Sequence, residues 1–142
     1  MDERVLLVDD EEDFLDALSE RMRNRGMQVA TSQSAAEAIQ TTEAGDYDVV
    51  VLDLLMPGMD GIQALKVLKD KRPDLQVILL TGHATVQKGI EAMKLGAMDL
   101  LEKPADINEL TEKIHKAKAR KMILVEKKTE AKIRDILKSK SW

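Results

Sequence analysis

The chain has 142 residues, of which 44% are hydrophobic and 34% are charged, and its formal net charge is −4. This length predicts one domain with a sizeable core, and the composition excludes disorder for most of the chain. Because there is no cysteine, a disulfide framework and a thiolate metal site are both excluded. The first residues lack the features of a signal peptide, and no apolar run reaches the roughly 18 residues of a membrane span. We therefore expect a soluble cytoplasmic protein with no membrane partner.

The charge is unevenly distributed along the chain. Residues 1–102 carry a net charge of −10, whereas residues 103–142 carry +6. An acidic body with a basic tail predicts either two roles or a tail that folds back onto the body.

Short apolar runs alternate with segments of helical periodicity. We expect strands at residues 4–8, 28–31, 49–54, 76–80 and 98–101, and helices at 12–24, 34–45, 61–71, 85–95 and from about 106 onwards. Gly26 and Gly96 favour helix ends, Ser34 to Glu37 form a capping box, and Pro73 stops the third helix. Five such β-then-α units predict an α/β fold with a doubly wound, five-stranded parallel sheet. We expect the flavodoxin-like order 2-1-3-4-5, with helices on both faces.

The end of the chain is expected to be one long helix. After Pro104 there is no glycine or proline, and apolar residues recur at roughly helical spacing. A helix of about 33 residues would be about 50 Å long, and the sheet can cover only its first few turns. We therefore divide the chain into a domain at 1–117 and a basic helical extension at 118–142.

Acidic side chains follow two of the predicted strands. Asp9 and Asp10 come directly after the first strand, and Asp53 ends the third, which is apolar throughout. In the expected strand order these two strands are neighbours, so the three carboxylates share one crevice. Such a cluster favours a divalent cation, and Mg²⁺ fits best. The alternative is that residues 9–13 form only a helix cap and an acidic first turn.

A hydroxyl and an ammonium group are expected at the same edge of the sheet. Thr81 ends the fourth strand, and Lys103 follows the fifth. Beside a metal-filled acidic pocket, both groups can stabilise a phosphoryl group. Taken alone, Lys103 would be interpreted as a loop lysine in a salt bridge. Together with Asp9, Asp10 and Asp53, it favours a phosphoryl site.

These residues stand in a familiar arrangement of motifs. The motifs are Val-Asp-Asp-Glu at 8–11, Asp-Leu-Leu-Met-Pro-Gly-Met-Asp-Gly at 53–61, Thr-Gly at 81–82, Gly-Ala at 96–97 and Glu-Lys-Pro at 102–104. Their combination resembles the receiver domain of bacterial response regulators over about residues 3–117. The resemblance implies that a sensor histidine kinase is the phosphodonor and that Asp53 is the phosphoacceptor.

The resemblance also implies roles for the surrounding residues. It implies Mg²⁺ held by Asp10, Asp53 and the backbone carbonyl of Leu55, with Asp9 helping through water. It further implies a hydroxyl at Thr81 that follows the phosphoryl group and a lysine at Lys103 that contacts it.

Three positions depart from the common pattern of this family. Leu100 stands where a tyrosine or phenylalanine usually reports the switch, so an aromatic readout is absent. Leu55, two residues after the phosphoacceptor, is apolar and limits water access to an acyl phosphate. His83, two residues after Thr81, is either an acid, base or hydrogen-bond donor near the site or an exposed loop histidine.

The sequence predicts less about how the chain acts on downstream partners than about its phosphoryl site. We expect a non-enzymatic, stand-alone receiver that contacts a downstream protein through the face of its fourth helix, fifth strand and fifth helix. No helix-turn-helix fits residues 118–142, and no motif favours direct nucleic-acid contact. The tail is either a solvated basic helix or a helix for docking or homodimer formation. Two alternatives remain: a phosphate-independent interaction module that acts through this helix, and a Mg²⁺-dependent phosphohydrolase, which Leu55 disfavours.

Overall fold

The computed structural model describes residues 2–56, 58–82 and 86–140, in which strands and helices alternate along the chain. The elements are β1 (Arg4–Val8), α1 (Glu12–Arg23), β2 (Gln28–Ser32), α2 (Ala35–Ala44), β3 (Val49–Asp53), α3 (Gly61–Lys71), β4 (Gln76–Thr81), α4 (Val86–Lys94), β5 (Asp99–Glu102) and α5 (Ile107–Ser139). All strand pairs are parallel, and the strand order is β2-β1-β3-β4-β5. The expected α/β fold and strand order are therefore confirmed.

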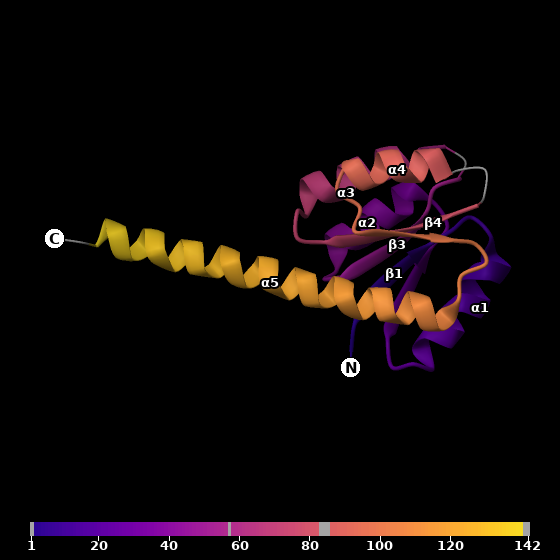
Figure 1. Cartoon of the computed structure of the whole chain (residues 1–142), viewed down its shortest axis with the longest axis horizontal. Helices are drawn as coiled ribbons and strands as arrows, with labels where there is room; N and C mark the ends of the chain where they lie inside the picture. The colour runs from indigo at the N-terminus through magenta and orange to yellow at the C-terminus, as the bar shows by residue number, and fades with distance from the viewer. Residues whose placement is uncertain (1, 57, 83–85, 141–142) are drawn as a thin grey trace.

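The sheet lies between two layers of helices, with α2, α3 and α4 on one face and α1 and α5 on the other (Figure 1). Every residue of β3 and β4 is buried, which explains why these strands are apolar on both faces. Val50 and Leu52 belong to the core beneath α2, α3 and α4, whereas Val49 and Val51 belong to the core beneath α1 and α5. The alternation places successive side chains of β3 in the two cores in turn.

Glycines and polar caps end the helices where expected. Gly26 and Gly96 have φ angles of 89° and 107°, and each closes its helix with the paired backbone hydrogen bonds of a Schellman motif. The Ser34 hydroxyl accepts from the Glu37 N–H at 3.1 Å. In the expected capping box the Glu37 carboxylate would accept from the N–H of Ser34, the N-cap residue. In the structure it accepts from the N–H of Gln33, one residue earlier.

Most predicted boundaries hold within one residue. β5 is shifted one residue towards the C-terminus of the chain: its pairing with β4 begins at Asp99, opposite Ile78, and Met98 precedes it, donating its N–H to the Val77 carbonyl at 2.8 Å. Pro57, His83, Thr85 and Trp142 lie outside the described residues.

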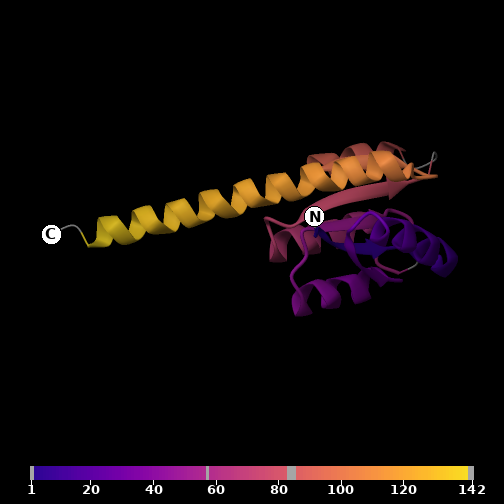
Figure 2. The same ribbon diagram turned by 90° about the horizontal axis from the view of Figure 1, so that it is seen from below.

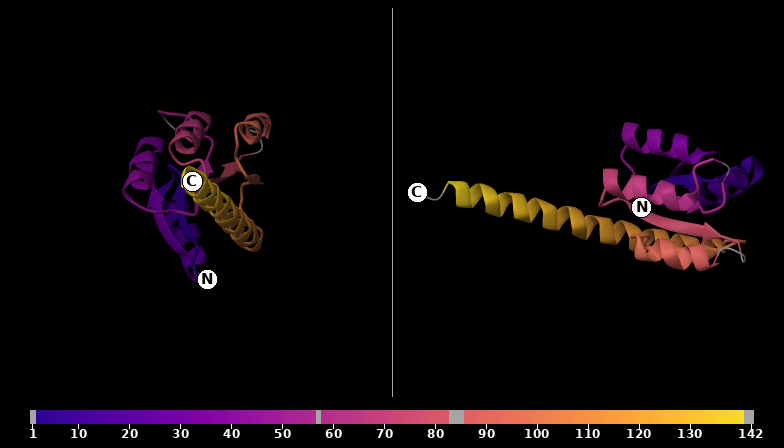
Figure 3. Two further views of the ribbon diagram at one scale, coloured as in Figure 1. Left: turned by 90° about the vertical axis from the view of Figure 1, so that its left-hand side faces the viewer. Right: turned by 90° about the horizontal axis from the view of Figure 1, so that it is seen from above.

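Helix α5 is one continuous helix of 33 residues, as predicted. Its buried residues end at Lys121, and the rest extends past the body, away from the edge where the strands end (Figures 1 and 2). The view from above shows the same projection (Figure 3, right). Within the described part of the chain, no helix combines the length and apolar character that a membrane span requires.

Gly61 begins α3 directly above the end of β3. A Cβ atom there would lie 2.7 Å from the Leu54 Cα and 3.0 Å from the Asp53 carbonyl oxygen, both of which are backbone atoms. We expect Gly61→Ala to lower the free energy of unfolding by about 1–3 kcal/mol, since the backbone must shift. Gly82→Ala is the control, because a Cβ at Gly82 meets nothing within 4 Å. Urea titrations of both variants test this, and equal stability of the two would contradict it.

Candidate functional site

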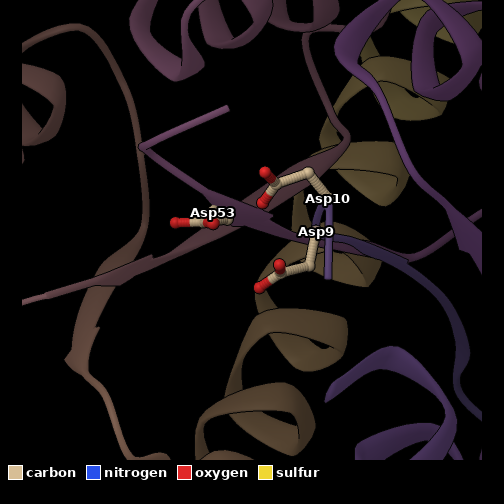
Figure 4. Close-up of side chains that lie close together, drawn as sticks. All are labelled: Asp9, Asp10 and Asp53. Carbon is tan, nitrogen blue, oxygen red and sulfur yellow. The ribbon is translucent and has the colours of Figure 1, made fainter. Parts of the chain in front are cut away.

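Three carboxylates meet where β1 and β3 end. Their ligand atoms all lie within 4.8 Å of one another, and they come from Asp9, Asp10 and Asp53 (Figure 4). β1 and β3 pair in parallel with Val8 opposite Leu52, so the residues that follow emerge at the same edge. The strand order therefore produces the acidic cluster.

Asp9 and Asp10 differ in their surroundings. Asp9 is fully buried, and its carboxylate accepts from the Glu11 N–H at 2.9 Å and from the Lys103 ammonium at 2.7 Å. Asp10 is exposed to solvent. Asp9 is thus fixed by the fold, whereas Asp10 can rotate towards an incoming ligand.

Asp53 is 5% exposed and lies at the base of the site. Burial raises the pKa of its carboxyl group, and the negative charge of Asp9 adds to that rise. The Leu55 N–H, at 3.2 Å, and the Lys103 ammonium, at 3.3 Å, oppose the rise but do not cancel it. The neutral form of the Asp53 carboxyl group is therefore favoured more than it is in a solvent-exposed aspartate.

Lys103 reaches the site from the loop after β5. Its N–H donates to the Thr81 carbonyl at 2.8 Å, and the Lys103–Pro104 peptide bond is cis. Burial disfavours the ammonium, but the bonds to Asp9 and Asp53 outweigh burial and raise the pKa of Lys103. The Nζ atom also lies 4.5 Å from the centre of the Phe14 ring, within cation–π range. The salt bridge expected of a loop lysine is present, and it is made to the acidic cluster itself.

Thr81 and Leu55 complete the expected set. Thr81 is 1% exposed and follows Leu80, the residue paired with Asp53 across the sheet, and its hydroxyl donates to the Gly82 carbonyl at 2.9 Å. Leu55 turns its side chain outwards and is 52% exposed. All six expected site residues thus lie at one edge of the sheet, whereas His83 is outside the described residues.

The cluster fits a hard divalent cation. Three carboxylates offer oxygen ligands, and one ammonium group, that of Lys103, contacts two of them. A divalent cation would add positive charge to this acidic cluster. Mg²⁺ characteristically takes one or two carboxylates and keeps other positions for water and phosphate oxygens. Asp10 and Asp53 are the carboxylates best placed for this, because both Asp9 oxygens already accept hydrogen bonds, from Glu11 at 2.9 Å and from Lys103 at 2.7 Å, and the Lys103 bond to Asp53 is longer, at 3.3 Å.

Two features of the site were missed by the sequence-based reasoning. The Phe14 ring beside Lys103 depends on how α1 packs near the β5–α5 loop, and no local pattern signals it. The backbone N–H groups of Glu11 and Leu55, each two residues after an aspartate, hold Asp9 and Asp53. An aspartate that bonds the backbone two residues further on is a known turn tendency, so this second feature had a usable signal.

Comparison with known proteins identifies the family. The family model described as the response regulator receiver domain matches residues 5–115. The chain belongs to the response regulator receiver family. A crystal structure of a receiver domain protein from Clostridium thermocellum is 34% identical, has a TM-score of 0.82, and is matched over 86% of this chain and 98% of that chain. The resemblance inferred from the motifs is confirmed.

Curated relatives of this receiver are larger regulators. The photosynthetic apparatus regulatory protein RegA of Cereibacter sphaeroides is 40% identical over 110 residues, which are 78% of this chain and 60% of RegA. The C4-dicarboxylate transport transcriptional regulatory protein DctD of Pseudomonas aeruginosa is 37% identical over 127 residues, which are 89% of this chain and 27% of DctD. The receiver therefore spans about 60% of the first relative and about a quarter of the second.

Proposed function

We propose that the chain is a phospho-accepting receiver that takes a phosphoryl group onto Asp53 from a histidine kinase or a small phosphodonor. The observation that carries this proposal is the convergence of Asp9, Asp10 and Asp53 with the Lys103 ammonium at one sheet edge. We place this activity in the cytoplasm, and we propose signalling by contact rather than by enzymatic turnover.

The proposed reaction is a phosphoryl transfer between two nucleophiles. A carboxylate oxygen of Asp53 attacks phosphorus as the bond from phosphorus to the donor's imidazole nitrogen breaks. The bond electrons remain on the imidazole, and Asp53 becomes an acyl phosphate. The Leu55 N–H orients the attacking carboxylate, because it donates to one Asp53 oxygen at 3.2 Å.

The other residues of the site manage charge. Lys103 already contacts Asp53, and after transfer its ammonium would bind the phosphoryl oxygens. Thr81 would turn its hydroxyl to the same oxygens. Asp10, Asp53 and the Leu55 carbonyl would hold Mg²⁺, with Asp9 assisting through water. When bound, Mg²⁺ neutralises charge on the carboxylates and on the transferred group.

We place the response to phosphorylation on the surface formed by α4, β5 and α5. Ile90 and Met93 of α4 are exposed apolar residues that suit a downstream protein partner. Gly89 faces the side chain of Leu100, which stands where relatives usually have an aromatic ring. A change at Thr81 would then reach α4 through packing of Leu100. A homodimer through α5 is a further contact that we propose.

Mass spectrometry tests the proposal. Incubation with acetyl phosphate and Mg²⁺ should add the mass of one phosphoryl group to the intact chain, and chelation of Mg²⁺ should prevent the addition. Asp53→Asn should gain nothing, whereas Asp60→Asn is the control, because Asp60 caps α3 outside the acidic cluster. Equal addition to the wild type and Asp53→Asn would reject the proposal.

One observation favours a second candidate, a phosphate-independent interaction module. The part of α5 beyond Lys121 is exposed although it carries several large apolar residues. If the chain acted only as such a module, Asp53→Asn would leave partner binding unchanged, whereas truncation after residue 121 would abolish partner binding.

Phe14 is expected to support transfer by holding Lys103. Its ring lies 4.5 Å from Nζ, and such contacts contribute about 0.5–2 kcal/mol, so Phe14→Leu should slow phosphorylation about two- to thirtyfold. Phe14→Tyr keeps the aromatic face and should retain the wild-type rate. Single-turnover mass spectrometry with acetyl phosphate measures both variants. Equal slowing by leucine and tyrosine would contradict the cation–π role.

A further inference from the structure

The projecting part of α5 is a helix without a partner. Residues 122–139 make up 18 residues, or about five turns, and they are exposed. An isolated helix of this length is only marginally stable in water, and packing of an apolar face normally supplies the missing stability. Such a face is present, because Met122, Ile133 and Ile136 are each more than half exposed.

Four of the seven exposed large apolar residues of this segment, with Thr129 among them, form a stripe along one side of the helix, and Ile123, Leu124 and Leu137 lie outside it. At about 100° per residue, Met122, Val125, Thr129, Ile133 and Ile136 fall within an arc of about 80°. Two of these positions repeat after 11 residues, from Met122 to Ile133 and from Val125 to Ile136, which is a spacing that supports supercoiled pairing of helices. The five residues are called the apolar stripe below.

The apolar stripe lies to one side of the buried face of α5, and among its five residues Met122 and Val125 border the body of the molecule. The buried residues of α5, Leu110, Ile114, Ala117 and Lys121, centre about 90° around the helix from it. Met122 and Val125 line an open hollow of about 360 Å³ between α5 and the loops that precede β3 and β4. A second helix can therefore lie along the stripe, and a twofold axis between the helices would place the two bodies on opposite sides of the pair.

Charged residues on both sides of the apolar stripe favour one partner, a second copy of this helix, and one relative direction of the two helices. Glu126 and Glu130 flank the stripe on one side, and Lys128 and Lys132 flank it on the other. In a parallel pair of identical helices, each acidic flank meets the basic flank of the other copy. In an antiparallel pair, acidic meets acidic and basic meets basic, which is destabilising.

We propose that the apolar stripe binds the same stripe of a second copy of this chain, with the two α5 helices parallel. This deepens the homodimer contact proposed above and does not require phosphorylation of Asp53. Lys121 fixes the direction in which the stripe leaves each body. Its ammonium donates to the Tyr47 carbonyl at 2.9 Å and to the carboxylates of Asp48 and Asp46 at 3.2 and 3.4 Å. The parallel arrangement therefore holds two receiver bodies at the same end of the paired helices.

Disulfide cross-linking tests both the partner and the direction, because the chain has no cysteine of its own. In a parallel pair the two Ile136 positions lie side by side, so Ile136→Cys should give a disulfide-linked dimer under mild oxidation. The control is Ala131→Cys, an exposed position on the opposite side of the helix. We expect Ile136→Cys to cross-link at least about tenfold faster at micromolar concentration, because pairing raises the effective thiol concentration.

Three results would overturn the proposal. The first is equal cross-linking of Ile136→Cys and Ala131→Cys. The second is a monomer by light scattering at the concentrations used. The third is linkage only between Met122→Cys and Ile136→Cys chains in a mixture, which would indicate an antiparallel pair. Asp53→Asn, introduced beside Ile136→Cys, should leave the cross-linking rate unchanged, so failure here is distinguishable from failure of the phosphorylation proposal.

Charge reversal tests the flanks separately. Lys128→Glu with Lys132→Glu makes both flanks acidic, and we expect Ile136→Cys cross-linking to fall to the rate of the Ala131→Cys control. A partner chain with Glu126→Lys and Glu130→Lys, also carrying Ile136→Cys, should restore linkage as a heterodimer of the two variants. Undiminished linkage of the all-acidic variant with itself would overturn the role of the flanks.

Discussion

Lys103→Met is expected to slow phosphorylation of the chain about a hundredfold, which is the usual effect of removing one preorganised donor from a developing anionic group. The ammonium lies 3.3 Å from Asp53, and within the described residues no other cationic side chain forms a salt bridge with Asp9 or Asp53. The metal-free variant should also lose about 1–3 kcal/mol of unfolding free energy, because the fully buried Asp9 side chain loses the hydrogen bond and ion pair that Lys103 makes with it. Added Mg²⁺ should restore part of that stability.

The matched control for this substitution is Lys113→Met. Lys113 pairs with Asp99 at 2.6 Å, away from the acidic cluster, so its loss should leave the phosphorylation rate unchanged. Timed intact-mass measurements give the rates, and urea titrations with and without Mg²⁺ give the stabilities. A Lys103→Met variant that is phosphorylated as fast as Lys113→Met would remove Lys103 from the mechanism.

Lys121→Met is expected to have the largest effect on how α5 is held. Lys121 is 9% exposed and contacts Asp46, Tyr47 and Asp48 at the start of β3. Without Lys121, the partly buried Asp48 carboxylate keeps its hydrogen bond from the Arg4 N–H but loses its closest ammonium, at 3.2 Å. The ammonium of Lys118 remains, but it lies farther away, at 3.8 Å. We expect a loss of about 1–3 kcal/mol of unfolding free energy, together with faster amide hydrogen exchange in α5 from residue 118 onwards.

A solvent-exposed lysine of the same helix provides the comparison. Lys116 pairs with Glu112 at 3.6 Å, and both side chains are about 70% exposed. Lys116→Met should therefore change stability by no more than about 0.5 kcal/mol. If the two methionine variants unfolded at the same urea concentration, Lys121 would not anchor the helix.

The edge of the sheet that carries the site was predictable because its residues follow strands of unusually clear composition. Val49 to Leu52 are apolar on both faces, which requires a central parallel strand, and parallel strands place their final residues at a common edge. Asp53, Thr81 and Lys103 can therefore be grouped from the sequence alone. Gly26 and Gly96 likewise marked helix ends because their positive φ angles are costly for other residues.

The contacts within the site were less predictable because they depend on packing between distant elements. Nothing near Phe14 in the sequence indicates that its ring lies beside Lys103, 89 positions further along the chain. Lys118 and Lys121 belong to the basic tail that the sequence predicts as a solvated or docking helix, but both contact aspartates before β3 in the same chain. The expectation of a tail that folds back is thus met as far as Lys121, and beyond it the helix projects.

Locating the phosphoryl group on the chain tests the central claim most directly. After incubation with acetyl phosphate and Mg²⁺, borohydride reduces an aspartyl phosphate to homoserine, which survives digestion and can be assigned by tandem mass spectrometry. We expect homoserine at position 53 and not at position 9 or 10. The Asp9 oxygens already accept hydrogen bonds from Glu11 and Lys103, and Asp10 is exposed to solvent. Homoserine at position 9 or 10, or none at position 53 in a chain that has gained phosphoryl mass, would contradict the assignment of Asp53 as the phosphoacceptor.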